Sequence, residues 1–168
     1  MAGSVIYRID ADDRIMEVND EWRRFAEAND GNPDPAAVLG RPIWDFIGDD
    51  GNSSIYRSMV HAVRSKVAPL LIPFRCDSPT QERHMTMTLA PGHMGEVVFV
   101  CALQYAFDIP PDRAAPPKDE HTRIVECDVC HRIRTDRGWR DCWDVIKAKD
   151  IEIDDRPIAV LHTRCPNC

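Results

Sequence analysis

Two Cys-x-x-Cys pairs constrain the last quarter of this 168-residue chain more than any other feature of the sequence. The first pair is Cys127 and Cys130, and the second is Cys165 and Cys168. A Cys-x-x-Cys turn points both sulfurs at one spot, and two such turns supply the four thiolates of a tetrahedral metal site, where zinc is the commonest ion. We therefore predict that these four cysteines bind zinc.

Other chemistries use similar cysteine patterns. Cys127, Cys130 and His131 spell the attachment motif of c-type haem, but that attachment requires export, and residues 1–8 lack the basic and apolar runs of a leader. Four thiolates also hold iron–sulfur clusters, so the spacing leaves zinc and iron–sulfur both open. His131 and His162 lie beside the cysteines and could replace a thiolate, although such imidazoles more often support a ligand or face water.

The segment between the cysteine pairs carries structure of its own. Its pattern predicts a hairpin with its turn at 135–138, a helix at 141–149 and a short apolar strand at 158–161. A segment of fewer than fifty residues has too small a hydrophobic core to fold unaided, so we expect a bound metal to stabilise it. Loss of the metal should then unfold this module and leave the rest of the chain nearly unchanged.

The charge balance bears on partners and location. The formal net charge is −7, and nine Lys or Arg residues balance nine Asp or Glu residues over 121–168. The absence of a basic surface counts against nucleic-acid binding as the function. No apolar run reaches membrane-spanning length and no signal peptide is recognisable, so we expect no membrane association and a soluble, cytoplasmic protein with reduced cysteines.

A proline-rich stretch divides the chain. Residues 108–120 are rich in proline and charge and lack hydrophobic periodicity, which is typical of an extended spacer. We therefore expect three parts: a domain at 1–105, a linker at 106–120 and a metal-binding module at 121–168.

The first part has the pattern of a mixed α+β domain. Two short strands at 5–10 and 14–18 form a hairpin, and Asn19 caps a helix that follows. Short helical turns occupy 38–47, and a longer helix begins at 51 and ends near 66. Three strands complete the domain, at 70–75, 84–90 and 96–104.

This element order resembles a PAS domain. The likeness includes Ile9-Asp10 before Arg14-Ile15, Val18-Asn19 before Trp22, and the segment 39–47, which is similar to the family's "GR.l.dfi" motif. Residues 73–79 and the cysteine pairs resemble a bacterial subgroup in which a PAS-like sensor precedes a cysteine-rich tail. The resemblance implies a five-stranded antiparallel sheet with helices on one face, a cup for a small ligand, and signalling through dimers or attached domains.

The family's usual cofactors find little support in the residues. The segment 40–44 lacks the cysteine of flavin-binding light sensors. Haem-binding members usually offer a histidine on the long helix, but His61 lies on the opposite side of the 51–66 helix from its apolar face. The cup could instead hold a small apolar ligand or be filled by its own side chains. The residues expected to line it are Trp22, Phe25, Trp44, Phe74, Met85, Met87 and Phe99.

The strand at 96–104 indicates a protein contact, because both of its faces are apolar. We expect the face away from the helices to be covered by a second copy of the domain, giving a homodimer through the sheet, or by the metal-bearing tail folded back. Cys101 and Cys142 have the character of small packing residues.

An enzyme is the less favoured class. Cys76 beside Asp77 could be a nucleophile with His84 near it along the hairpin, but the sequence holds no phosphate loop, carboxylate dyad or nucleophile motif. We therefore expect a non-enzymatic sensor that signals to a partner protein in trans. The alternative is a thiol or metal redox sensor that releases its metal on oxidation.

Overall fold

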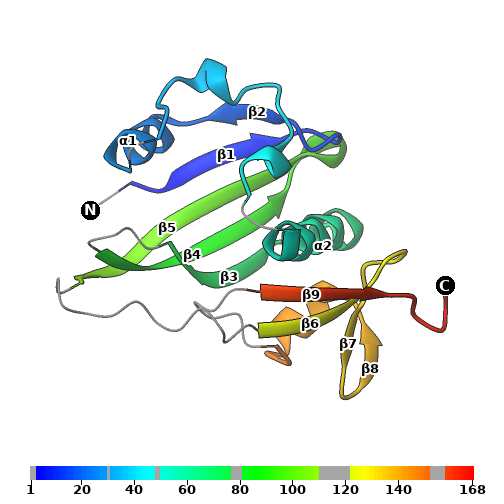
Figure 1. The fold of residues 1–168 in the computed structure, drawn as a ribbon. Coiled ribbons are helices and arrows are strands. Elements are labelled where there is room, and N and C mark those ends of the chain that lie inside the picture. Colours follow the sequence, from blue (N-terminus) through cyan, green and yellow to red (C-terminus); the bar gives the residue numbers. More distant parts are fainter. Residues whose placement is uncertain (1–2, 30, 48–49, 77–80, 110–121, 152–157) are drawn as a thin grey trace.

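The computed structural model of the protein describes residues 3–29, 31–47, 50–76, 81–109, 122–151 and 158–168. Two sheets organise this part of the chain (Figure 1). The larger has five antiparallel strands in the order β2-β1-β5-β4-β3, and the smaller has four strands in the order β8-β7-β6-β9. The strands of the larger sheet are β1 (Val5–Ile9), β2 (Ile15–Val18), β3 (Leu70–Arg75), β4 (Gln81–Pro91) and β5 (Val97–Asp108).

Side-chain alternation gives the large sheet one buried face. Along β5, Val97, Phe99 and Cys101 are buried while the residues between them are half-buried. Met85, Met87 and Leu89 follow the same alternation on β4, and Met87 pairs with Cys101 and Leu89 with Phe99 across the two strands. The period of two predicted from the sequence therefore sets which face carries the core.

The helices cover that buried face. Helix α1 (Asp20–Ala28) starts at Asn19, whose side chain accepts a hydrogen bond from the Trp22 N–H group, as the capping pattern predicts. Helix α2 (Asp50–Lys66) is the longest helix. Short 3-10 segments are η1 (Pro35–Ala37), η2 (Ile43–Asp45) and η3 (His93–Gly95). The predicted α+β, PAS-like architecture, with a five-stranded antiparallel sheet and helices on one face, is thereby confirmed.

Strands β4 and β5 are longer than predicted. They remain paired from Gln81 opposite Asp108 to Pro91 opposite Val97, with a bulge next to Met85. The sheet therefore continues three residues beyond position 105, where we expected the first domain to end. Most of the expected linker, 110–120, lies outside the described residues, so the three-part division stays a prediction.

The cysteine-rich module forms the smaller sheet. Its elements are β6 (Thr122–Cys127), β7 (Ile133–Thr135), β8 (Gly138–Arg140), α3 (Cys142–Lys147) and β9 (Ile158–Thr163). The hairpin, the helix and the last strand agree with the sequence pattern, and Cys142 is buried in the core as expected. Strand β6 was not predicted, and it pairs with β9 in parallel, from Thr122 opposite Ile158 to Cys127 opposite Thr163.

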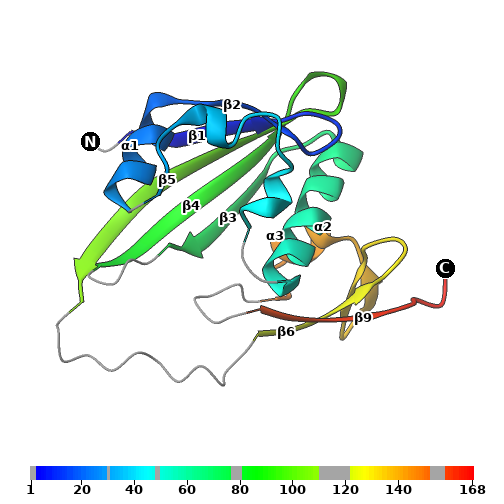
Figure 2. The ribbon, with the colours of Figure 1, turned by 45° about the horizontal axis from the view of Figure 1, so that its top comes forward.

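Helix α2 lies between the two sheets (Figures 1 and 2). Its buried side chains include Ile55, Met59 and Val63, and the hydrophobic core continues past the helix to Ile124 and Val145 of the module. The module contacts α2 through β9 and α3. The suggestion that the tail covers the outward face of the large sheet is therefore wrong, because the tail packs on the helix side.

The outward face of the large sheet carries apolar side chains at its surface. Val98, Val100 and Ala102 of β5 are half-buried, Ile6 of β1 is 37% exposed, and Leu71 of β3 is 58% exposed. Among the described residues, no helix is long and apolar enough to cross a membrane.

Candidate metal centre

The four predicted cysteines come together at one end of the small sheet. Strands β6 and β9 run parallel, so the turns that follow them emerge at the same edge. Cys127 is the last residue of β6, and Cys165 follows β9 by two residues. The Sγ atoms of Cys127, Cys130, Cys165 and Cys168 all lie within 4.8 Å of one another. The convergence predicted from the spacing is confirmed.

The sulfur separations suit a metal ion. The Sγ atoms of Cys130 and Cys165 are 3.7 Å apart, and those of Cys165 and Cys168 are 3.5 Å apart. A disulfide would need about 2.0 Å. A tetrahedral zinc ion with Zn–S bonds of about 2.3 Å places its sulfurs about 3.8 Å apart. The four cysteines could therefore hold a metal ion with little rearrangement.

Backbone hydrogen bonds shape the two cysteine turns. The His131 N–H group donates to the Cys127 carbonyl oxygen at 3.1 Å, and the Cys168 N–H group donates to the Cys165 carbonyl oxygen at 3.1 Å. The Cys165 N–H group also donates to the Cys127 sulfur at 3.4 Å, which joins one turn to the other. Cys127 and Cys165 are buried, whereas Cys168 is exposed. The site thus has a closed side in the module and an open side at Cys168.

The thiols of the cluster do not ionise alike. Burial opposes ionisation of Cys127, but N–H groups of Cys130, Cys165 and Val129 donate to its sulfur and lower its pKa to about 6. Hydrogen bonds with Cys130 and Cys165 stabilise the protonated form of Cys168 and raise its pKa to about 12. Burial raises the pKa of Cys130. Cys127 therefore ionises more readily than Cys130 and Cys168, and a bound cation would favour the thiolate forms of those two residues.

The two histidines next to the cysteine turns have other partners. The Nδ1 atom of His131 is 2.7 Å from Glu126 Oε1, and the Nε2 atom of His162 is 2.9 Å from Ser54 Oγ. Glu126 is fully buried on β6, and Ser58 Oγ donates to its Oε1 atom at 2.7 Å. The contacts of His162 and Glu126 connect the module to α2. The group that could hold a metal ion within the described residues consists of cysteines alone.

Sequence reasoning missed Glu126, Ser54 and Ser58. The one available signal was an acidic residue between Val125 and Cys127 in an otherwise apolar stretch. A carboxylate in that position needs a buried partner, but nothing in the sequence indicates that the partners lie some seventy residues earlier on α2.

The residues predicted to line the cup meet the core from several elements. Met85, Met87 and Phe99 are buried, and Trp22, Phe25, Trp44 and Phe74 are partly buried against the same core. The ring of Tyr7 stacks on Phe99 with centroids 4.6 Å apart. Burial raises the pKa of Tyr7 well above its usual value and that of Cys101 to about 12. Whether these residues bind a small apolar ligand stays a prediction.

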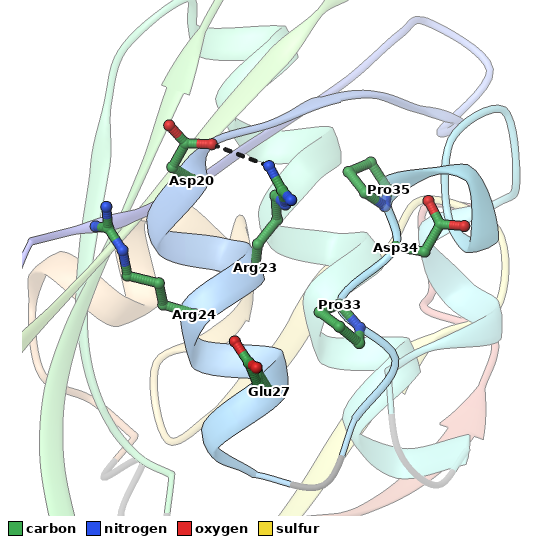
Figure 3. A pocket seen from close by; sticks show the side chains of 7 residues that line it. All are labelled: Asp20, Arg23, Arg24, Glu27, Pro33, Asp34 and Pro35. Carbon is green, nitrogen blue, oxygen red and sulfur yellow. Dashed lines mark hydrogen bonds and ion pairs between the residues drawn. The ribbon is translucent and has the colours of Figure 1, made fainter.

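A surface hollow lies elsewhere, between α1 and the segment 33–35 (Figure 3). It has a volume of about 550 Å³ and is lined by Asp20, Arg23, Arg24, Glu27, Pro33, Asp34 and Pro35. Arg23 already forms an ion pair with Asp20 at 3.4 Å. The hollow is polar and shares no residue with the predicted cup.

The contacts of His84 do not support a role as the base for a Cys76 nucleophile. The His84 ring stacks on Tyr105 at 4.4 Å, and its Nε2 atom is 2.8 Å from Glu82 Oε1. Cys76 packs against the core, and Asp77 lies outside the described residues. His61 is exposed, as predicted, and its ring lies 5.8 Å from that of His131.

Comparison with known proteins finds structural likeness at low similarity. No protein-family model matches the chain, and no curated protein matches it. The PAS domain of BvgS from Bordetella pertussis aligns with a TM-score of 0.40 and 17% identity, over 60% of this chain and 71% of that one. The PAS domain of an HTR-like protein from Haloarcula marismortui aligns with a TM-score of 0.34 and 20% identity, over 63% and 81%. The PAS-like assignment therefore rests on the strand order and the helix placement.

Replacing one cysteine of the cluster should abolish tight metal binding. We expect the purified protein to contain about one zinc ion per chain, and the Cys165→Ser variant to lose it during gel filtration because a buried ligand is missing. Metal analysis by mass spectrometry measures this. Cys142→Ser, which alters a buried cysteine outside the cluster, is the matched control and should keep its zinc. Equal zinc content in both variants would contradict the assignment.

Zinc affinity should fall in acid. Cys127 has a lowered pKa and is a thiolate at pH 7, whereas Cys130 and Cys168 have raised pKa values and must lose protons when the metal binds. Each proton released lowers the affinity about tenfold per pH unit below the pKa of its thiol. Chelator competition at pH 6, 7 and 8 measures the slope. An affinity that does not change over this range would show that the ligands are not these thiols.

Proposed function

We propose that this protein is a non-enzymatic PAS-type sensor that acts through protein contacts and carries a structural zinc ion in its C-terminal module. The observation that carries the proposal is the five-stranded sheet of order β2-β1-β5-β4-β3, with helices on one face and an apolar surface on the other. The helix side supplies the candidate cup, and the outward side supplies the candidate contact. The four cysteines supply the zinc ligands.

The sensor side of the proposal rests on the cup residues. Buried Met85, Met87 and Phe99 and partly buried Trp22, Phe25, Trp44 and Phe74 meet over the inner face of the sheet. Methionine and aromatic side chains repack easily around a small apolar molecule. A ligand inserted among them would press on α2, which packs over the same core.

The output side of the proposal rests on the outward face of the sheet. Val100 lies at its centre, opposite Ile6 on one side and Thr88 on the other. Nearby along β5, Tyr105 and Phe107 are 51% and 59% exposed. We propose that a second copy of the protein covers this face, and that the dimer signals to a partner protein in trans.

A charge placed at the centre of this face should break the dimer. We expect Val100→Glu to weaken dimerisation by about tenfold or more, because an ionised carboxylate would be buried without a partner. Sedimentation equilibrium measures the dissociation constant. Met94→Glu is the matched control, since Met94 is 95% exposed on η3, away from the strand. A wild-type protein that stays monomeric at high concentration, or a Val100→Glu variant that dimerises normally, would refute the dimer.

The exposed position of Cys168 favours one alternative, a redox sensor. Cys168 is the solvent-facing member of the cluster, so an oxidant can reach its sulfur without unfolding the module. Oxidation of two thiolates to a disulfide would remove two ligands and release the metal.

Peroxide titration separates the two roles. A structural site should keep its zinc at peroxide concentrations that oxidise a small free thiol, whereas a redox site should release zinc at or below them. A zinc-sensitive dye follows the release, and the buried Cys142 serves as an internal reference for general oxidation. Zinc release that occurs only together with Cys142 oxidation would eliminate the sensor role.

A further inference from the structure

A fully buried carboxylate occupies the contact between α2 and the cysteine-rich module. Glu126 has an exposed fraction of 0%. Its Oε2 atom accepts a hydrogen bond from Ser54 Oγ at 2.6 Å, and its Oε1 atom accepts one from Ser58 Oγ at 2.7 Å. His131 completes the group with its Nδ1 atom 2.7 Å from Oε1. We call Ser54, Ser58, Glu126 and His131 the joint.

The joint includes both flanks of the first cysteine turn. Glu126 directly precedes Cys127, and His131 directly follows Cys130. The contact between the carboxylate and the imidazole can therefore form only while the turn keeps its shape. Since the four cysteines would be held in place by a metal ion, metal binding would also fix the position of the carboxylate.

The second half of the module reaches the same place on α2. His162 of β9 lies three residues before Cys165, and its Nε2 atom is 2.9 Å from Ser54 Oγ. Because the Ser54 proton points to Glu126, the His162 Nε2–H group is the donor in this contact. Both strands that lead to the cysteine turns therefore meet α2 at one serine.

The two serines lie one helical turn apart on the face of α2 that meets the module. Ser58 lies four positions after Ser54, so their side chains are neighbours along the helix. Ile55, Met59 and Val63 follow the same spacing one residue later, and all three are buried in the core. One stripe of α2 thus contacts the module, and an adjacent stripe contacts the core beneath the large sheet.

We propose that the joint couples the four-cysteine site to α2, so that metal occupancy and the conformation of the sensor helix depend on each other. The inference rests on the proposed metal site. A buried carboxylate cannot lose its donors without penalty, so a displaced cysteine turn either separates the module from α2 or moves the helix with it. In contrast to our expectation from the sequence, metal loss should then affect α2 of the first domain as well as the module. By reciprocity, a ligand that shifts α2 changes the metal affinity of the module.

Hydrogen–deuterium exchange of the full chain tests the coupling. The probes are the α2 amides at 55–64, compared between the zinc-loaded protein and the protein treated with a chelator. We expect zinc removal to speed their exchange by about tenfold. The β1 and β5 amides report whether the large sheet stays folded. Equal α2 exchange in the two states, with protection lost in the module alone, would overturn the proposal.

Variants of the joint show whether these contacts carry the coupling. In the Ser54→Ala/Ser58→Ala double variant, the effect of zinc on α2 exchange should fall to less than about twofold, because the helix no longer holds the carboxylate. Ser65→Ala is the matched control, since Ser65 is an exposed serine of α2 that lies 3.4 Å from His61, and it should respond like the wild type. A double variant with the full zinc response would overturn the proposal. The single Ser54→Ala change, at a half-buried position, keeps the test available if the double variant does not fold.

Cobalt substitution distinguishes failure of the joint from failure of the metal site. The double variant should still bind one cobalt ion and show the intense absorption of a four-thiolate site. That spectrum together with a lost α2 response supports the coupling. Absence of the spectrum from the wild-type protein would refute the proposed metal site, and the coupling with it.

Discussion

The parallel pairing of β6 with β9 is the contact on which the C-terminal module depends. The two strands are joined by residues 128–157, and bringing them together costs loop-closure entropy that a module of this size recovers poorly from its own core. Their pairing places both cysteine turns at one edge and brings Glu126 and His162 to the same helix. A metal ion held by the two turns would stabilise this pairing in a module that has few buried side chains of its own.

Helix α2 lies within one hydrophobic core that continues from the large sheet into the module. It covers the buried face of the large sheet through Ile55, Met59 and Val63, and it meets the module through Ser54 and Ser58. The cysteine-rich module is therefore not a loosely attached tail, because α2 of the first part also packs against it (Figure 2). Helix α2 thus contacts both the predicted cup residues and the module that carries the four cysteines, so a displacement of this helix would reach both parts.

The sequence predicted local features well and the contact between the two parts poorly. Alternation predicted the strands, Asn19 predicted the start of α1, and the Cys-x-x-Cys spacing predicted the two turns whose cysteines meet, because each of these features depends on residues close together in the chain. Strand β6 was not predicted, because its apolar run is short and is interrupted by Glu126. The packing of the module on α2 was not predicted, because a serine on a helix looks the same in the sequence whether it faces water or a buried carboxylate.

X-ray absorption at the zinc edge, measured on the purified protein, tests the proposed zinc site most directly. A site built from Cys127, Cys130, Cys165 and Cys168 predicts a single shell of four sulfur atoms at about 2.3 Å from zinc. A shell that contains nitrogen or oxygen, or fewer than four sulfurs, would contradict it, because the module would then be held together by something other than these four thiolates.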